Sequence, residues 1–272
     1  MTDTSIAAAY VATNDFRVGS VIRRSGAVLS RHFLTFLIVA VTAESPTLLM
    51  AYMQPTELIG PSEAFSLGLV ATLVDLLLMV LGTLSYAIIL HAAFQDMRRR
   101  PVSLAESMKV GSSRFLPLIG IAFVQKFVIL PGMILLTIPV LFLYEMWFVG
   151  LLLFLIIPSS LLYTMWFVGV PACVVERLWP WTSLRRSREL TKGFRWRVFA
   201  LALPLFVVNA GSSNVIEPVL TAIAVPIVGL AGQLIWAGVT AAFTSIVFAV
   251  TYYDLRVIKE GVDIEQITAV FD

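Results

Sequence analysis

The sequence predicts an all-α integral membrane protein: six transmembrane helices, arranged as three parallel repeats of an interfacial amphipathic helix and a helical hairpin. The first observation is composition, because the 272 residues are 59% hydrophobic and 13% charged, with a mean hydropathy of +0.92. Soluble domains carry about a quarter charged residues. The second is that apolar stretches of about 18 residues or more, long enough to cross a bilayer, recur along the chain. The third is a repeated basic segment between them.

Three basic segments show the repeat, and they read FRVGSVIRRSGAVLSRHF at 16–33, RRRPVSLAESMKVGSSRFLPL at 98–118 and PACVVERLWPWTSLRRSRELTKGFRWR at 171–197. Aligning Ser25, Ser107 and Ser187 places the segments in register, 82 and 80 residues apart. An apolar hairpin follows each one. We therefore expect a single membrane domain over 1–272, with repeats at 16–97, 98–178 and 179–256 and a cytoplasmic tail at 257–272.

The first repeat opens with a helical pattern over 17–32, in which Arg17, Arg24 and Arg31 recur every seven residues opposite an apolar side. Such a helix suits the membrane interface, with its arginines toward anionic headgroups. The first span is expected over 33–53, interrupted by the Glu-Ser-Pro sequence at 44–46. The second, over about 64–94, carries Asp75 and is stopped by Arg-Arg-Arg-Pro at 98–101.

The later repeats follow the same order. Spans are expected over about 115–142, which contains Lys126 and Pro131, and over about 147–175. A third surface helix is expected at 182–192, and the fifth span begins near Trp196 and becomes polar at 209–214. The sixth span ends near Tyr253. The stretch 219–232, rich in Gly and Pro, is either a re-entrant turn or the start of the sixth span, and both interpretations remain open.

The basic residues predict the orientation. Of the 19 Lys and Arg, 18 lie before the first span, between spans two and three, between spans four and five, or after span six, and Lys126 is the exception. The opposite loops contain only acids, namely Glu57, Glu63, Glu145 and Glu217. By the positive-inside rule both termini are cytoplasmic, and the predicted location is the bacterial inner membrane.

The search for catalytic motifs predicts no enzyme and no cofactor. The sequence contains no GxxxxGK[ST] phosphate loop, no HExxH and no GxSxG. The two histidines, His32 and His91, fall near the cytoplasmic boundary, where a metal site completed by Asp96 is conceivable and interfacial hydrogen bonding is the plainer interpretation. The single cysteine, Cys173, excludes an intramolecular disulfide and a cysteine-based metal site.

Ionisable residues inside the spans form one candidate site. Glu44 lies 19 residues after Ser25 and Lys126 lies 19 after Ser107, so the repeat places an acid and a base at equivalent depth, and Asp75 enters from the other side. A charge near mid-bilayer costs about 2.5–3.5 kcal/mol on insertion scales, so these groups should face the bundle interior and pair. They predict either a polar site or proton-linked pathway, or an internal ion pair that orders the hairpins.

The third surface helix forms the second candidate site. Its basic residues Arg185, Arg188, Lys192 and Arg195 are spaced to share a face. Trp179, Trp181 and Trp196 flank them, as aromatic anchors do at a membrane interface. We expect these residues either to determine topology or to recognise anionic lipid headgroups, and we expect no nucleic-acid partner.

The segments VPACVVERLWPWTSLRRSRELTKGFRWRVF at 170–199 and YYDLRVIKEGVDIEQI at 252–267 resemble a prokaryotic family of polytopic membrane proteins. That family is known from the membrane domain of membrane-anchored glycerophosphodiester phosphodiesterases and from stand-alone relatives of uncharacterised function. The shared motifs are V-E, L-R-R-S, L-T-K-G and Y-D-L-R. The resemblance implies amphipathic helices between hairpins, and it carries over no catalytic residue.

The predicted function is that of a non-enzymatic, lipid-interacting accessory or scaffold protein, whose partners are anionic membrane lipids and a cytoplasmic or membrane protein. The alternative is a transporter or lipid-translocating protein that uses Glu44, Asp75 and Lys126.

Overall fold

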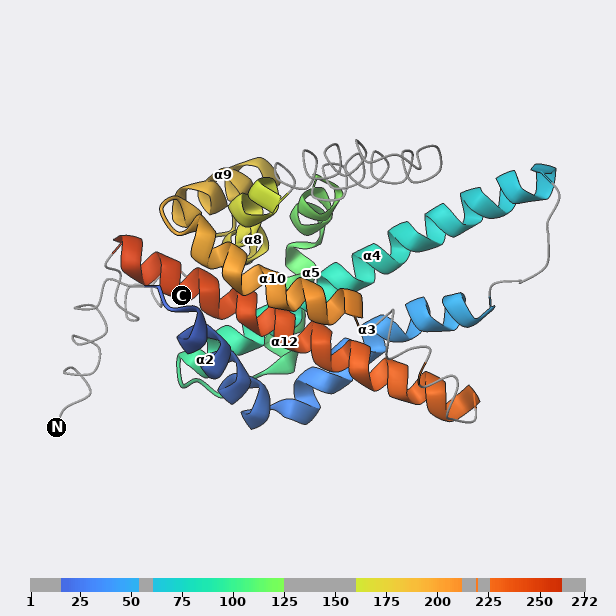
Figure 1. Ribbon diagram of the computed structural model, residues 1–272, viewed down its shortest axis with the longest axis horizontal. Helices are drawn as coiled ribbons and strands as arrows, with labels where there is room; N and C mark the ends of the chain where they lie inside the picture. The colour runs from blue at the N-terminus through green and yellow to red at the C-terminus, as the bar shows by residue number, and fades with distance from the viewer. Residues whose placement is uncertain (1–15, 54–60, 125–159, 212–218, 220–225, 261–272) are drawn as a thin grey trace, which may run out of the picture. The chain divides into compact units, whose positions relative to one another are not determined.

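The computed structural model describes residues 16–53, 61–124, 160–211, 219 and 226–260 (Figure 1). All regular secondary structure in these residues is helical, which confirms the all-α class. Predictions that fall on 125–159, including most of spans three and four and Lys126, lie outside the described residues. So do the polar stretch 212–218 and the predicted tail from 261 onward.

Two helices in the described residues are long and apolar enough to cross a membrane. The candidate spans are Leu76–Met97, within α4 (Pro61–Met97), and Val228–Glu260, within α12 (Pro226–Glu260). A third candidate is α2 (Val18–Arg31) taken together with the first part of α3 (Phe33–Met53), a pair bent by 91°. The described part of the chain is therefore helical with two or three candidate spans, and the six spans and three repeats remain predictions.

The bend between α2 and α3 separates the amphipathic helix from the apolar helix. α3 covers the residues expected for the first span, but the predicted interruption at Pro46 is wrong, because the helix continues through it. Proline lacks the N–H that would bond to the carbonyl four residues earlier. Here that carbonyl belongs to Thr42, and the Ser45 hydroxyl donates to it over 3.0 Å instead.

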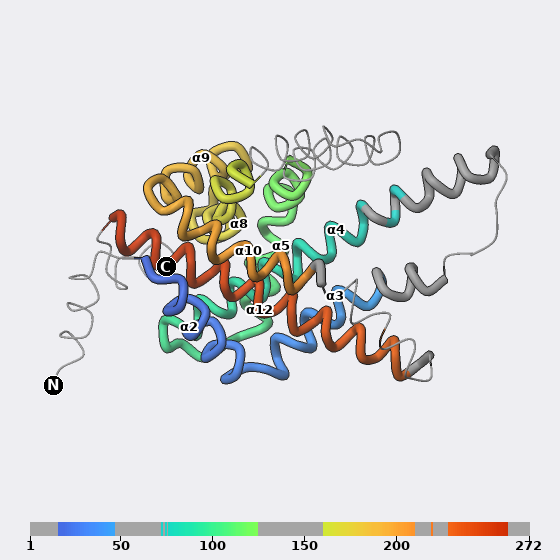
Figure 2. The backbone as a smooth tube through the Cα atoms, in the orientation of Figure 1, coloured from blue at the N-terminus to red at the C-terminus, as the bar shows by residue number. Residues whose placement is uncertain are grey.

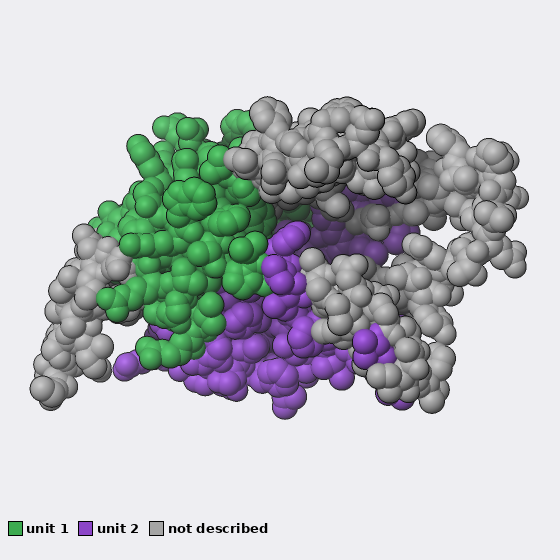
Figure 3. All heavy atoms as spheres, viewed as in Figure 1, with its two compact units in different colours: residues 1–23, 114–204, 248–272 green, residues 24–113, 205–247 purple. Residues whose placement is uncertain are grey.

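The described residues belong to two compact units, one within 16–23, 114–124, 160–204 and 248–260 and the other within 24–53, 61–113, 205–211, 219 and 226–247 (Figure 3). Three helices, α2, α10 (Arg195–Gly211) and α12, have residues in both units. Figure 2 traces the backbone of these helices. We call the first of these two units unit 1 and the second unit 2.

In unit 2, α3 packs on α4, and α4 packs on α5 (Leu104–Ser113). The end of α4 is closed at Arg99, whose φ of 57° lies in the left-handed region. The N–H groups of Arg99 and Arg100 donate back to the carbonyls of Asp96 and Gln95, at 2.9 and 3.0 Å. These bonds satisfy carbonyls that a helix end leaves unpaired.

The Gln95 side chain joins this helix end to the start of α5. Its amide oxygen accepts from the Ser103 N–H over 2.9 Å, and its amide nitrogen donates to Glu106 Oε2 over 2.7 Å. The Ser103 hydroxyl in turn accepts from the Glu106 N–H over 3.3 Å, as an N-cap serine does. The predicted second surface helix is thus fixed at both its cap and its first turn.

α12 packs closely against α3 in unit 2. A Cβ built on Gly238 would lie 2.6 Å from Val41 Cγ2 and 3.2 Å from Leu37 Cδ1, so only glycine fits. Small residues at such contacts let membrane helices approach closely.

In unit 1, an apolar helix over Ser160–Val175 ends in α8 (Gly169–Val175), and α9 (Pro180–Thr191) packs on α8. α9 agrees with the surface helix predicted at 182–192 and begins two residues earlier, with Pro180 in its first turn, where a missing N–H costs nothing. Its inner face is buried and comprises Ser183, Leu184, Ser187, Leu190 and Thr191.

α12 continues past Tyr253, where the sixth span was predicted to end. The helix runs from Pro226 to Glu260, so 226–232 and the first residues of the predicted tail, 257–260, belong to it. Arg256 and Glu260 pair within the helix, since Arg256 Nε donates to Glu260 Oε2 over 3.0 Å. At 1.5 Å per residue the helix is about 50 Å long, so it exceeds the roughly 30 Å hydrocarbon core.

Candidate functional site

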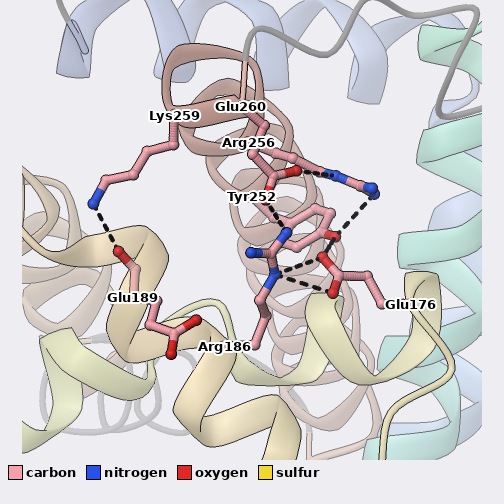
Figure 4. A network of polar contacts seen from close by, with 7 residues as sticks. All are labelled: Glu176, Arg186, Glu189, Tyr252, Arg256, Lys259 and Glu260. Atoms are coloured by element: carbon pink, nitrogen blue, oxygen red, sulfur yellow. Dashed lines mark hydrogen bonds and ion pairs between the residues drawn. The ribbon is translucent and has the colours of Figure 1, made fainter.

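Five polar side chains of unit 1 form a closed ring of contacts (Figure 4), which we call the ion ring. Glu176 caps the C-terminus of α8, and Arg186 lies on α9. The other members, Tyr252, Arg256 and Glu260, lie one helical turn apart on one side of α12. Three helices therefore meet at one polar cluster.

The ring closes through two carboxylates. Arg186 Nε donates to both oxygens of Glu176, at 2.9 and 3.0 Å, and the Tyr252 hydroxyl donates to Glu176 Oε1 over 2.6 Å. On the other side, Arg256 donates to the Tyr252 oxygen over 3.3 Å and to Glu260 Oε2 over 3.0 Å. A bond from Arg186 Nη2 to Glu260 Oε1 completes the circuit.

The ring is electrically balanced and largely shielded from solvent. Two guanidinium groups face two carboxylates, and Tyr252 is 1% exposed. The side chain of Glu176 is 15% exposed, while Glu260, at the end of α12, is 24% exposed. Breaking a buried pair by removing one partner is destabilising because it leaves a buried charge uncompensated. The ring thus holds α9 and the end of α12 against α8.

Arg186 remains charged in this environment. Burial acts to lower its pKa, but the hydrogen bonds to Glu176 and Glu260 and the charges of these carboxylates outweigh it, so the pKa of Arg186 is raised. A second contact lies beside the ring, where Lys259 Nζ donates to the Glu189 backbone carbonyl over 2.7 Å. It joins α12 directly to the last turn of α9.

Exposed bases and tryptophans lie on α9 and next to its two ends: Trp181, Arg185 and Arg188 on the helix, Trp179 and Lys192 at its caps, and Trp196 in the first turn of α10. Arg185, Arg188 and Lys192 are exposed, and the Arg185 side chain is 82% exposed while paired with Glu189 over 3.3 Å. Trp179, Trp181 and Trp196 are 72%, 73% and 81% exposed, respectively. We call these six residues the basic-tryptophan surface. It contains three of the four basic residues expected to contact lipid.

Arg195, the fourth of these residues, differs from the other three. It is half-buried, whereas Trp196, its neighbour on α10, is exposed. Its Nε atom is buried and has no hydrogen-bond partner among the described residues. We therefore leave Arg195 out of the basic-tryptophan surface.

Of the three ionisable residues predicted to lie inside the spans, Glu44, Asp75 and Lys126, the structure describes only the side chain of Glu44. This residue lies half-buried on α3. Asp75 falls within α4, but its side chain lies outside what is described, as does the whole of Lys126. The pairing of these three residues stays a prediction.

His32 and His91 have different partners. His32 Nε2 lies 3.1 Å from Asp96 Oδ1, and Arg31 donates to the other oxygen of Asp96 over 2.6 Å. His91 Nδ1 instead lies 3.0 Å from the Ser107 hydroxyl. Over the residues that the structure describes, no group of three or more His, Cys, Asp or Glu side chains could hold a metal ion.

The three serines used to align the repeats are all fully buried, at 0% exposure. Ser107 donates to the Ser103 carbonyl over 2.9 Å, in addition to its contact with His91. Ser187 donates to the Met165 carbonyl over 2.8 Å and accepts from the Val168 N–H over 3.2 Å. The Ser25 hydroxyl has no hydrogen-bond partner among the described residues. In the second and third segments, then, the aligned serine contacts the helix that precedes its surface helix.

Sequence reasoning missed the ion ring, although a signal for it was present. Three of the motifs that carry the family resemblance contribute to it: Glu176 from V-E, Arg186 from L-R-R-S and Arg256 from Y-D-L-R. The motifs lie far apart in the sequence, and Glu176 and Tyr252, which share a hydrogen bond, are 76 residues apart. No local pattern therefore showed that they meet.

Comparisons with known proteins add no family. No family model, no curated protein and no solved structure matches the chain. The resemblance described above therefore rests on its motif residues alone.

Proposed function

We propose that this chain is a non-enzymatic, lipid-interacting accessory or scaffold protein of a bacterial inner membrane, and that its basic-tryptophan surface contacts anionic headgroups. The exposure of three tryptophans beside three bases supports this most directly. Tryptophan is amphipathic and concentrates where one side meets hydrocarbon and the other meets water. Lysine and arginine attract anionic lipid by about 1 kcal/mol each near the surface.

The packing of α9 gives the surface a defined position. One side of the helix is buried against α8 and tied into the ion ring, so the exposed bases project from a fixed scaffold. A preorganised site loses less conformational entropy on binding than a flexible one. An anionic headgroup would meet bases that project from a helix already fixed in position.

Lipid retention tests the proposal. The full chain is released in detergent with phosphatidylglycerol present, and native mass spectrometry counts the lipids that remain bound. The Arg185→Gln/Arg188→Gln/Lys192→Gln variant should retain at least about tenfold less, since three bases together contribute about 3 kcal/mol.

A matched variant controls for net charge. Arg23→Gln/Arg100→Gln/Lys109→Gln also removes three exposed bases, but none from α9. It should retain nearly the natural amount. If both variants lost lipid equally, net charge alone would account for the retention. If the α9 variant lost no lipid, the proposal would be refuted.

We also propose the topology: six spans in three repeats with both termini cytoplasmic. The candidate spans and the 91° bend after the amphipathic helix support it. In a Cys173→Ser background, intact cells are treated with a membrane-impermeant maleimide. An Arg17→Cys variant should stay unlabelled, and a Glu57→Cys variant should react. The reverse pattern would invert the orientation, and labelling of both would rule out a span between them.

A further inference from the structure

We propose that Arg186 and Arg256 form a phosphate-binding cradle, which the Glu260 carboxylate fills in this structure. The inference rests on the proposed function, because it assigns a headgroup-binding role to the inner side of the same helix, α9. It starts from the way Glu260 is held. Each of its two oxygens accepts from a different arginine, Oε1 from Arg186 and Oε2 from Arg256.

The two arginines are arranged as a phosphate would require. A carboxylate bridging two guanidinium groups takes the same geometry as two oxygens of a phosphate, and arginine recognises both anions through its planar fork of N–H donors. Both guanidinium groups are also held from behind. Glu176 accepts from Arg186 on the inner side, and the Tyr252 hydroxyl accepts from Arg256.

Charge selects a monoanion as the ligand. Without Glu260 the ring would hold two guanidinium groups and the single carboxylate of Glu176, which leaves one positive charge. A phosphodiester carries one negative charge and would restore neutrality, as Glu260 does. The phosphodiester of an anionic lipid headgroup therefore fits the cradle, and free inorganic phosphate shares the chemistry at a higher charge.

Position makes Glu260 the exchangeable carboxylate. Glu176 is fixed by two partners at the end of α8, with its side chain 15% exposed. Glu260 is the last residue of α12, and its side chain is 24% exposed. Terminal helical turns fray readily. Opening of that last turn would free the two arginines without disturbing the bond between Tyr252 and Glu176.

Four full-length proteins test the cradle: the natural chain, Glu260→Gln, Arg256→Gln/Glu260→Gln and Glu106→Gln. Each is measured in nanodiscs for phosphatidylglycerol retained after exchange into neutral lipid, and in neutral detergent for inorganic phosphate binding. Glu106→Gln adds the same unit of positive charge on α5, a helix that carries neither the cradle nor the basic-tryptophan surface, and controls for net charge.

We expect Glu260→Gln to retain about tenfold more phosphatidylglycerol than the natural chain, the factor typical of one good charged contact. Both the double variant and Glu106→Gln should stay near the natural value. Gain with lipid alone would assign the cradle to headgroups, and gain with inorganic phosphate as well would assign it to any phosphate. No gain with either ligand, or an equal gain in Glu106→Gln, would overturn the proposal.

Two further comparisons keep the test decisive. If Glu260→Gln does not fold, Glu260→Asp keeps the charge but shortens the side chain, so it should show a smaller gain, and its failure to gain would overturn the cradle. The α9 variant of the preceding experiment separates the two proposals. If the triple α9 variant loses lipid and Glu260→Gln gains none, only the basic-tryptophan surface binds lipid. If the triple α9 variant loses no lipid and Glu260→Gln gains it, only the cradle does.

Discussion

The Tyr252 hydroxyl donates to Glu176 Oε1 over 2.6 Å, across 76 residues of sequence. This one bond joins the C-terminal half of α12 to the cap of α8 and sets Tyr252 at the centre of the ion ring, with its side chain buried. Because the hydroxyl also accepts from Arg256, one phenol connects the two halves of the ring.

Tyr252→Phe should destabilise the protein by about 1–3 kcal/mol, because it removes one donor from the shielded Glu176 carboxylate and leaves it with the bonds from Arg186. Thermal unfolding in detergent measures the loss. The matched control is Tyr163→Phe, which removes a hydroxyl from a side chain that is 40% exposed and should change stability little. Equal stability of the two variants would show that the bond contributes nothing.

Arg186→Gln and Arg185→Gln compare neighbouring arginines of opposite exposure. Arg186 contacts two carboxylates of the ring, whereas Arg185 forms a single exposed pair with Glu189. Allowing for partial solvent screening, the loss should be about 2–3 kcal/mol for Arg186→Gln, against about 0.5 kcal/mol or less for Arg185→Gln. Chemical unfolding of both variants measures this difference, and a reversed order would contradict the ring.

Gly238→Ala and Gly82→Ala should shift stability in opposite directions. The new Cβ at 238 would lie 2.6 Å from the stiff Val41 side chain, which should cost about 1–3 kcal/mol. Nothing lies within 4 Å of a Cβ at Gly82, so alanine there should stabilise α4 by about 0.5–1 kcal/mol. Thermal unfolding distinguishes them, and stabilisation by both would place α12 away from Val41.

Ser187→Ala and Ser25→Ala test the aligned serines. Alanine at 187 removes the acceptor of the Val168 N–H and the donor to Met165, so it should cost about 1–3 kcal/mol. Ser25 is equally buried, but its hydroxyl has no partner among the described residues, so alanine there should be neutral or stabilising. Unfolding measurements on the pair decide this, and a larger loss at 25 would reveal a partner there.

Several elements could be predicted from the sequence at residue level. The first apolar helix was placed at 33–53 and forms over Phe33–Met53, and the third surface helix forms within two residues of its predicted start. These predictions depended on the spacing of apolar and charged residues, which is a local property of the chain.

Other features depended on contacts that no local pattern reports. α12 continues past the predicted end of the sixth span because the charged Arg256 pairs with Glu260, and Glu260 also pairs with Arg186 from α9. The error at Pro46 has a local cause instead: the Ser45 hydroxyl donates to the Thr42 carbonyl, which proline leaves without its helical N–H donor.

The sequence by itself determined the all-helical class, the bases on α9 and the tryptophans beside them, because about twenty consecutive residues are enough to set each of these patterns. Only the tertiary structure decided which arginine faces inward. Arg185 and Arg186 are chemically identical neighbours, and a rotation of about 100° per residue turns one to solvent and the other toward Glu176 and Glu260. The carboxylates that receive Arg186 come from α8 and α12, and only folding brings those helices to α9.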